Sequence, residues 1–362
     1  AIGCSGLVFS RNTCDTQGSD ESTWDTCCKW PEVLCLEIKQ NHFLKLEFYM
    51  SEIKWMQDGP FGVMVHYIKG VQPRSGKLNP DFNAMVEQFD VSRLIQQVAQ
   101  TGAKWLFFTF GQNTGFYCSP NAYLESLIPG CCSRRDLMGE VADAAHAHGL
   151  KLIAYLPAEI DLQTDAFRSA LAWDSSGPGK QEFQKRYMRV IADWSLRLGN
   201  RIDGWFFDGC YDAKDKGFMR THDWDNARFD PQLWAEALRA GNPDAVFTMN
   251  AGVGYLHSVL PNQDFISGEF NDLSFVPDGP TSFGMQNQVL TWLDCRWLHT
   301  ESPGPIPPPR FTDQQLFTYV EQHRRVGSAV TLNIGIYEDG QLSQPSLKQL
   351  KRLDAYLAQT CV

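Results

Sequence analysis

The segment RIDGWFFDGC, at residues 201–210, ends an apolar run in a carboxylate, Asp208. Such a carboxylate is costly to bury unless it is paired or used in chemistry. A second run, DFISGEF at 264–270, carries Glu269. Two carboxylates are what glycoside hydrolysis requires, because one attacks the anomeric carbon while the other protonates the leaving oxygen and later activates water. Asp208 and Glu269 are therefore the candidate catalytic pair. The structural alternatives are that Asp208 caps the following segment and that Glu269 pairs with an arginine.

Further polar side chains follow the other apolar runs, and aromatic residues lie near them. The polar residues are His66 with Tyr67, Gln112 with Asn113, Tyr155 with Glu159, then Asn250, Asp294 and Asn333, and the aromatic ones are Tyr117, Trp205, Trp292 and Trp297. This collection is typical of a sugar site, although core packing is the commoner role of a strand tryptophan. The sequence has no Gly-rich phosphate loop, no Gly-x-Ser-x-Gly turn and no His-Glu-x-x-His motif. We expect an oligosaccharide or glycoconjugate substrate, and neither a metal nor a cofactor.

The elements that must position these residues are short apolar runs that alternate with amphipathic segments. Eight runs are present, at 61–67, 105–110, 151–157, 203–209, 245–251, 264–270, 288–295 and 329–335. Helix-like segments lie between several of them, for example at 90–102, where Asp90 is placed as a cap, and at 135–149. The pattern predicts an α/β fold, a (β/α)8 TIM-like barrel, with irregular connections after the fifth and sixth strands. An open doubly wound sheet is the alternative.

The domain organisation is predicted to be simple. Residues 1–45 read as a Cys-rich N-terminal extension packed on the barrel, and residues 46–362 read as the catalytic domain. A final amphipathic helix at 346–359 leaves no room for a C-terminal β-sandwich. Of 11 cysteines, none forms a Cys-x-x-Cys pair with a matching second pair, so disulfides in an oxidising compartment are favoured over a zinc site. Cys210 is a candidate to pair with Cys295.

The charge balance limits the classes of partner. The formal net charge is -10 and the pI is near 5.3, without any run of Lys or Arg, which argues against nucleic acid and anionic membranes. No apolar stretch reaches the ~18 residues of a membrane span. Because the chain begins at Ala1, we expect a secreted or periplasmic bacterial protein after removal of a signal peptide. The oligomeric state cannot be predicted.

Several segments in the right order resemble the α-L-fucosidases of glycoside hydrolase family 29. These segments are WMQDGPFGVMVHY (55–67), FDVSRLIQQVAQTGAKWLFFTF (89–110), HGLKLIAYLP (148–157), IDGWFFDG (202–209) and VTLNIGIYEDGQL (330–342). The fourth looks like the family's Trp-Phe-Asp-Gly strand, and the last is similar to its Leu-Leu-Asn-Val-Gly-Pro-x-x-Asp-Gly signature. The resemblance implies an exo-acting, retaining α-L-fucosidase.

The resemblance also implies roles for individual residues. Asp208 matches the nucleophile and Glu269 the acid/base, with Asp294, Glu301 and Glu159 as rivals for the second role. His66 and Tyr155 match residues at the sugar.

The sequence departs from the family pattern in the sugar pocket. QNTGF, with Gln112 and Asn113, stands where the family has His-His-Asp-Gly-Phe, and Tyr67 stands for a tryptophan. NAGVG at 250–254 lacks the family's arginine. A different sugar on the same scaffold, or a sugar-binding protein without catalysis, are therefore the alternatives.

Overall fold

The computed structural model describes residues 53–177, 179–211, 229–254 and 256–360. The chain divides into two compact units, Ala1–Tyr49 and Met50–Val362. The predicted Cys-rich extension at 1–45 lies outside the described residues, so its packing on the barrel stays a prediction.

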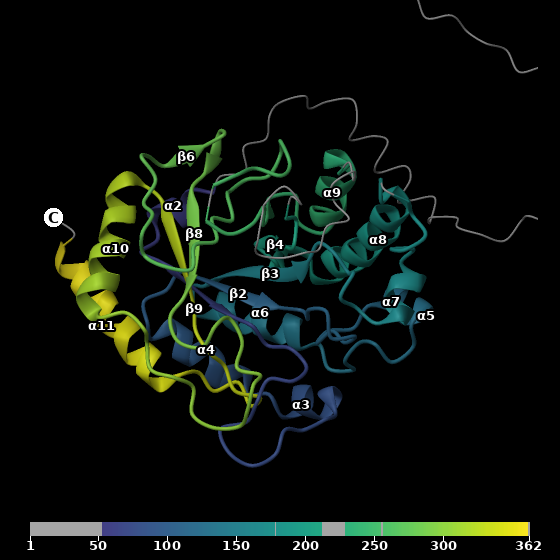
Figure 1. The fold of residues 1–362 in the computed structure, drawn as a ribbon, viewed down its shortest axis with the longest axis horizontal. Helices are drawn as coiled ribbons and strands as arrows, with labels where there is room; N and C mark the ends of the chain where they lie inside the picture. Colours follow the sequence, from purple (N-terminus) through teal and green to yellow (C-terminus); the bar gives the residue numbers. More distant parts are fainter. Residues whose placement is uncertain (1–52, 178, 212–228, 255, 361–362) are drawn as a thin grey trace, which may run out of the picture. The chain divides into compact units, whose positions relative to one another are not determined.

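The second unit is built on a parallel sheet of seven strands (Figure 1). The strands are β1 (Gly62–Val65), β2 (Trp105–Thr109), β3 (Lys151–Pro157), β4 (Gly204–Asp208), β5 (Val246–Met249), β8 (Gln288–Trp292) and β9 (Ala329–Asn333). Their order is β5-β4-β3-β2-β1-β9-β8, so neighbours along the chain are neighbours in the sheet, with β9 beside β1. Seven of the eight predicted runs therefore form strands.

The remaining run, residues 264–270, lies between the edge strands β5 and β8 without forming a regular strand. Glu269 forms isolated parallel bridges with Val253, just after β5, and with Leu290 of β8. Gly268 interrupts the extended backbone with a φ of +53°, and a Cβ there would lie 2.0 Å from the Gln288 carbonyl oxygen of β8. Only glycine permits this approach. The predicted regular strand is therefore absent at 264–270, although the segment lies between β5 and β8 as the order of the runs predicts.

The side chains on one face of the sheet pack against one another. Every strand and the 264–270 segment contribute to this interior cluster, which contains Met64, Trp105, Phe107, Ile153, Tyr155, Phe206, Val246, Phe265, Leu290 and Ala329, together with Met56. Phe107 of β2 contacts Phe265 with 6.4 Å between ring centroids. A strand in the middle of the sheet can contact the segment beyond its edge only if the sheet curls round. The doubly wound alternative is therefore wrong.

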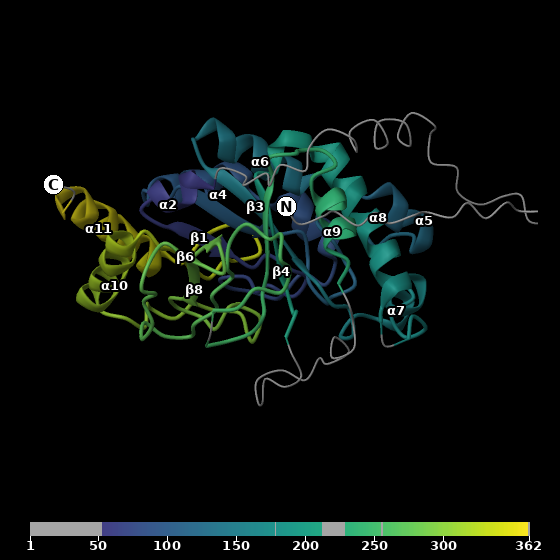
Figure 2. The same ribbon diagram turned by 90° about the horizontal axis from the view of Figure 1, so that it is seen from above.

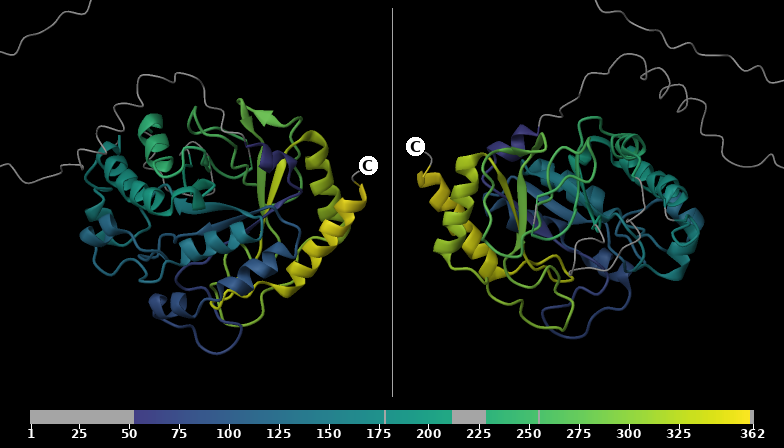
Figure 3. Two further views of the ribbon diagram at one scale, coloured as in Figure 1. Left: turned by 180° about the vertical axis from the view of Figure 1, so that it is seen from behind. Right: turned by 45° about the horizontal axis from the view of Figure 1, so that its top comes forward.

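The opposite face of the strands packs on helices (Figures 2 and 3). The helices are α3 (Phe82–Gln88), α4 (Val91–Ala99), α5 (Ala122–Leu127), α6 (Leu137–Ala147), α7 (Asp165–Ala170), α8 (Gln181–Leu198), η2 (Gly199–Arg201), α9 (Pro231–Leu238), α10 (Asp313–Val326) and α11 (Gln344–Thr360). The short helix α2 (Lys54–Asp58) instead contributes Met56 to the interior cluster. In Figure 2, α10 and α11 lie on one side of the strands, and α5, α7 and α8 on the other. None of the described helices is long and apolar enough to cross a membrane.

Local sequence signals set the helix boundaries. Asp90 caps α4 as predicted, since its carboxylate accepts a hydrogen bond from the amide of Arg93 at 2.9 Å. Thr312 and Gln315 form a capping box at the start of α10. Among the described residues no helix follows β5 or the 264–270 segment, where instead the small hairpin β6 (Thr281–Ser282) and β7 (Met285–Gln286) forms. The predicted irregularity is confirmed there.

Candidate active site

Asp208 and Glu269 converge at the carboxyl end of the curled sheet. Asp208 is the last residue of β4 and shares the inward face with Phe206, two positions earlier. Glu269 is 7% exposed and reaches the same place from the 264–270 segment. The Asn250 side-chain nitrogen lies 2.8 Å from Asp208 Oδ1 and 2.6 Å from Glu269 Oε2. The Tyr211 hydroxyl lies 2.9 Å and 3.4 Å from the same two oxygens.

Three donors fix the orientation of the Asp208 carboxylate. Tyr211 and Asn250 donate to Oδ1, and the Tyr155 hydroxyl donates to Oδ2 at 2.5 Å. The side-chain amide of Gln112 in turn donates to the Tyr155 oxygen at 2.9 Å. Because all three groups donate, both oxygens of Asp208 act as acceptors and the carboxyl group is held in one orientation.

The amide of Asn250 is itself held in one orientation. Its Oδ1 accepts hydrogen bonds at 3.1 Å from the Gly252 backbone amide and from the Ser267 hydroxyl. Because the oxygen is taken by these donors, the NH2 group must face the two carboxylates. Asn250 is 1% exposed, so its side chain is enclosed by these partners. The bridge between Asp208 and Glu269 is therefore rigidly positioned.

The environment of Glu269 favours its neutral form. Burial, and next the negative charge of Asp208, raise the pKa of Glu269 from 4.5 to about 8. Hydrogen bonds from Asn250 and Tyr211 and the positive charge of Arg296 oppose this shift. At neutral pH the site thus holds a proton on Glu269 beside a carboxylate with three donors, which is the division of roles that acid catalysis needs.

His66 at the end of β1 lies beside this pair as a neutral imidazole. Burial lowers its pKa from 6.5 to about 4, against the opposing effects of Asn333 and Asp208. Its Nδ1 lies 2.8 Å from Asn333 Oδ1, and the Asn333 nitrogen donates to the Trp297 carbonyl oxygen at 3.0 Å. The amide oxygen can only accept, so Nδ1 carries the hydrogen and Nε2 is left as an acceptor. Its ring centroid is 5.0 Å from that of Tyr155.

Trp297 adopts an unusual backbone conformation next to His66. Its φ is +58°, and the amide of Leu298 donates across it to the Arg296 carbonyl oxygen at 2.6 Å. A non-glycine residue in this region is strained and needs support from its surroundings. The bond from Asn333 supplies such support. The Trp297 ring, half-buried, lies 5.9 Å from His66 between centroids.

Gln112 and Asn113 lie in the loop after β2, which Gln163 ties down. The Gln163 amide donates to the Gln112 carbonyl oxygen at 3.0 Å, and its oxygen accepts from the Gly115 amide at 2.9 Å. Asn113 Oδ1 is buried and has no hydrogen-bond partner among the described residues. A buried acceptor without a partner is costly, so this atom is suited to accept from a ligand hydroxyl.

Two of the residues predicted to bind substrate point away from the site. Tyr67 packs on Phe89 with ring centroids 4.5 Å apart, and its hydroxyl donates to the Glu338 carbonyl oxygen. The Trp205 indole donates to the Leu238 carbonyl oxygen of α9 at 3.1 Å. Both residues alternate with inward-facing neighbours, so the pleat turns them to the helix side. The prediction that they contact substrate is corrected accordingly.

Asp294 also lies apart from the pair and has a structural environment. Its Oδ1 accepts from the amides of Cys295 and Gly335, at 2.6 and 2.8 Å, and its Oδ2 accepts from the Ser346 hydroxyl at 2.6 Å. These bonds tie the end of β8 to the segment after β9 and to α11. Because its acceptors are used in this way, neither the predicted sugar contact nor the rival role as acid/base suits Asp294.

The other rivals for the acid/base role differ in exposure. Glu301 is exposed in the Pro-rich loop. Glu159 is 4% exposed. It lies close to Gly209, the residue after Asp208, since a Cβ on Gly209 would be 2.8 Å from the Glu159 Cγ. Glu269, by contrast, shares the donors Asn250 and Tyr211 with Asp208.

Two residues of the site were not predicted from the sequence. Tyr211 contacts both carboxylates, and Arg296 acts on Glu269 through its charge. Both follow strand-end carboxylates that were recognised, at three and two residues beyond Asp208 and Asp294. A search of each strand-end loop to its third residue would have found them.

The cysteines that the structure describes carry free thiols. They are Cys118, Cys131, Cys132, Cys210 and Cys295, and all are buried. The expected pairing of Cys210 with Cys295 was therefore wrong. The remaining cysteines lie outside the described residues, and export of the protein stays a prediction.

Comparisons with known proteins identify relatives of this fold. The family model for alpha-L-fucosidase matches residues 47–250, more than half of the chain. An endo-fucoidan hydrolase of glycoside hydrolase family 107 is 13% identical with a TM-score of 0.62, covering 87% of this chain and 95% of that one. The alpha-L-fucosidase AlfC from Lactobacillus casei, in complex with its α-L-fucose product, is 16% identical with a TM-score of 0.56, covering 84% and 98%.

A further fucosidase structure gives a similar result. The alpha-L-fucosidase isoenzyme 1 from Paenibacillus thiaminolyticus is 18% identical with a TM-score of 0.57, covering 87% of this chain and 77% of that one. No curated protein sequence matches the chain. At these identities the structural likeness establishes the fold, and the family model alone establishes kinship.

Proposed function

The chain belongs to the α-L-fucosidase family, and on that premise we propose that it is an exo-acting, retaining glycoside hydrolase that releases terminal α-L-fucose from glycans. The residues matched by the family model, 47–250, include Asp208 and Asn250 but not Glu269. The nucleophile is therefore supported by kinship and geometry together, whereas the acid/base is supported by geometry.

The observation that carries the proposal is the Asn250 nitrogen shared by the two carboxylates. It lies 2.8 Å from Asp208 Oδ1 and 2.6 Å from Glu269 Oε2, so these oxygens can be no farther apart than the sum of the two distances. That upper limit lies below the roughly 6.5 to 9.5 Å of inverting glycosidases and is compatible with the roughly 5 to 5.5 Å of retaining ones.

The proposed reaction has two displacements. Asp208 attacks the anomeric carbon while Glu269 gives its proton to the glycosidic oxygen, so the aglycone leaves and a fucosyl ester forms on Asp208. Glu269, now ionised, then takes a proton from water, whose oxygen displaces Asp208 and returns the sugar with its original configuration. Hydrogen bonds from Tyr155, Tyr211 and Asn250 orient Asp208 for both attacks.

We propose that the curled sheet is a barrel of the (β/α)8 type in which the 264–270 segment replaces the sixth strand. The bridges of Glu269 to Val253 and to Leu290 support this arrangement. It explains why Glu269 can face Asp208: a segment that closes the barrel beside β5 directs its side chains into the same interior.

The sugar pocket favours a second candidate, a related deoxy or modified hexose on the same scaffold. Gln112 is engaged with Tyr155, so it contributes less freely to a sugar than the histidine that it replaces. Asn113 brings an acceptor without charge. These amides alter the donor and acceptor pattern of the pocket but leave the carboxylate pair unchanged.

A panel of nitrophenyl glycosides tests the proposal and separates the two candidates. Release from the α-L-fucoside that disappears in Asp208→Asn supports fucosidase activity. Release from another glycoside alone, with the same dependence on Asp208, supports the second candidate. Binding of fucose by calorimetry without turnover of any glycoside would contradict both and favour a sugar-binding protein.

A further inference from the structure

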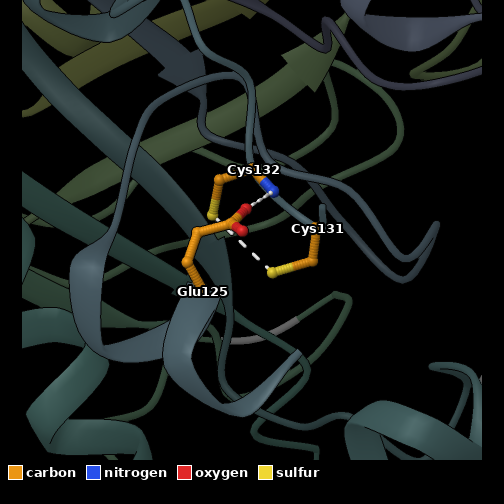
Figure 4. Close-up of side chains that lie close together, drawn as sticks. All are labelled: Glu125, Cys131 and Cys132. Carbon is orange, nitrogen blue, oxygen red and sulfur yellow. Dashed lines mark hydrogen bonds between the residues drawn. The ribbon is translucent and has the colours of Figure 1, made fainter. Parts of the chain in front are cut away.

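A second cluster of reactive side chains lies outside the sugar site, at the end of α5 (Figure 4). Glu125 belongs to that helix, and Cys131 and Cys132 belong to the turn that follows it. One ligand atom from each residue lies within 4.8 Å of the others. The cysteines are 3% and 6% exposed and the glutamate is half-buried. In Figure 4 the three side chains point toward one another.

The distance between the two sulfurs matches metal coordination better than a disulfide. The Sγ atoms of Cys131 and Cys132 are 3.8 Å apart. A disulfide would require about 2.05 Å. Two thiolates bound to one tetrahedral ion, each with a metal–sulfur distance of about 2.3 Å, are about 3.8 Å apart, which is the edge of that tetrahedron. The thiols therefore already have the spacing of two zinc ligands.

The carboxylate of Glu125 is oriented toward the sulfurs by the backbone. Its Oε1 accepts from the Cys132 amide and its Oε2 accepts from the Gly130 amide, each at 2.7 Å. Each oxygen has a further lone pair free of these bonds. Backbone donors of this kind typically hold a ligating carboxylate in place around a bound metal.

The charges of the cluster also favour a cation. Among the described residues no Lys or Arg forms an ion pair with Glu125 (the described ion pairs lie elsewhere). Metal binding requires the thiolate form, so a bound dication would displace the thiol protons.

We propose that Glu125, Cys131 and Cys132 form a binding site for one Zn²⁺ ion. Binding converts the two thiols to thiolates and releases two protons to solvent, so two thiolates and one carboxylate surround the ion. A water molecule on the half-buried side of Glu125 completes the tetrahedron. The site is independent of the proposed sugar chemistry, since none of its ligands contacts Asp208 or Glu269.

The position of the site indicates a structural role. Tyr117 forms a parallel bridge with Cys132, its amide donates to the Cys131 carbonyl oxygen at 3.0 Å, and its own carbonyl accepts from Ser133 at 2.8 Å. The Tyr117 hydroxyl accepts from Gln163, which also anchors the loop carrying Gln112. A bound ion would fasten this turn to α5 through Glu125, and the backbone bonds to Tyr117 connect the turn to the loop after β2.

Zinc binding to the full, reduced chain tests the proposal. The probes are Zn²⁺ with a competing chromophoric chelator, and Co²⁺, whose thiolate charge-transfer absorption reports sulfur ligands. The double variant Cys131→Ser/Cys132→Ser should bind one equivalent less than the wild type. The matched control Cys118→Ser/Cys295→Ser removes two other buried thiols and should keep that equivalent. Zinc should raise the melting temperature of the wild type and the control by roughly 5 °C more than that of the double variant.

Two results would overturn the proposal. One is the same zinc stoichiometry in the wild type and the double variant. The other is a disulfide between Cys131 and Cys132, found as a peptide 2 Da lighter in the protein as isolated and resistant to mild reduction. If the double variant does not fold, Cys131→Ser alone leaves every backbone hydrogen bond of the turn in place. It should weaken the site at least about 100-fold, and an unchanged affinity would contradict the assignment.

Discussion

The hydroxyl of Tyr211 lies 2.9 Å from Oδ1 of Asp208, three residues earlier in the chain. The same hydroxyl is 3.4 Å from Glu269, so one side chain connects the candidate nucleophile and the candidate acid. Burial, and next the charge of Asp208, raise the pKa of Tyr211 well above its usual range, so it remains a donor at any pH at which the enzyme would work. The carboxylate pair is therefore part of a network that includes Asn250 and Tyr155.

Removing the Tyr211 hydroxyl should slow the reaction without unfolding the protein. We expect Tyr211→Phe to lower kcat/KM roughly 10- to 100-fold, because one oriented donor to Asp208 is lost. Tyr67→Phe is the matched control, since its hydroxyl bonds a backbone carbonyl on the helix side. Equal effects of the two variants, measured by steady-state kinetics, would show that Tyr211 has no special role.

Neutralising Asp208 should abolish turnover. Asp208→Asn keeps the size of the side chain but cannot attack carbon, so we expect kcat to fall by roughly 10⁴-fold or more. Circular dichroism and the melting temperature should stay close to those of the wild type, because Asp208 is partly exposed and its neighbours remain. A folded variant with full activity would remove Asp208 from the mechanism.

The alkaline limb of the pH–rate profile should report Glu269. The acid must be protonated to act, and its pKa is raised to about 8, so kcat/KM should fall as the pH rises through that value. Arg296 lowers this pKa by its charge, so Arg296→Gln should move the limb to higher pH, whereas Arg296→Lys should leave it nearly unchanged. A limb that does not move in Arg296→Gln, or that persists in Glu269→Gln, would contradict this assignment.

Acid should destabilise the fold through two buried histidines. Burial lowers the pKa of His66 and of His323 from 6.5 to about 4. At these two side chains the unfolded chain binds protons that the folded chain does not, so the histidines lower the free energy of unfolding as the pH falls from 6.5 toward 4. Glu269, whose pKa is raised to about 8, acts in the opposite direction over the same range. Urea titrations at pH 7 and pH 5 measure the change. The free energy of unfolding of His323→Gln should fall less between pH 7 and pH 5 than that of the wild type, and an unaltered pH dependence in that variant would exclude His323 as a source.

Period-2 alternation explains both what the sequence could predict and what it could not. The apolar runs located seven strands, and the strand ends indicated Asp208, His66 and Tyr155, whose side chains the structure brings together. The predicted sugar contacts of Tyr67 and Trp205 were wrong because adjacent residues of a strand face opposite sides of the sheet. Residue type alone does not show which side a side chain faces. The bend at Gly268 and the pairing of Asp294 with Ser346 depend on contacts between distant segments, which no local pattern reveals.

The configuration of the azide-rescue products tests most directly whether Asp208 is the nucleophile and Glu269 the acid/base of a retaining glycosidase. With nitrophenyl α-L-fucoside as substrate, azide should restore turnover to Asp208→Gly by attacking from the vacated side, giving the inverted β-fucosyl azide. In Glu269→Gly, azide should instead attack the fucosyl ester on Asp208 and give the retained α-fucosyl azide. Opposite anomers from the two variants, identified by proton NMR, are the predicted result. The same anomer from both variants, or an α product from Asp208→Gly, would contradict these roles of Asp208 and Glu269.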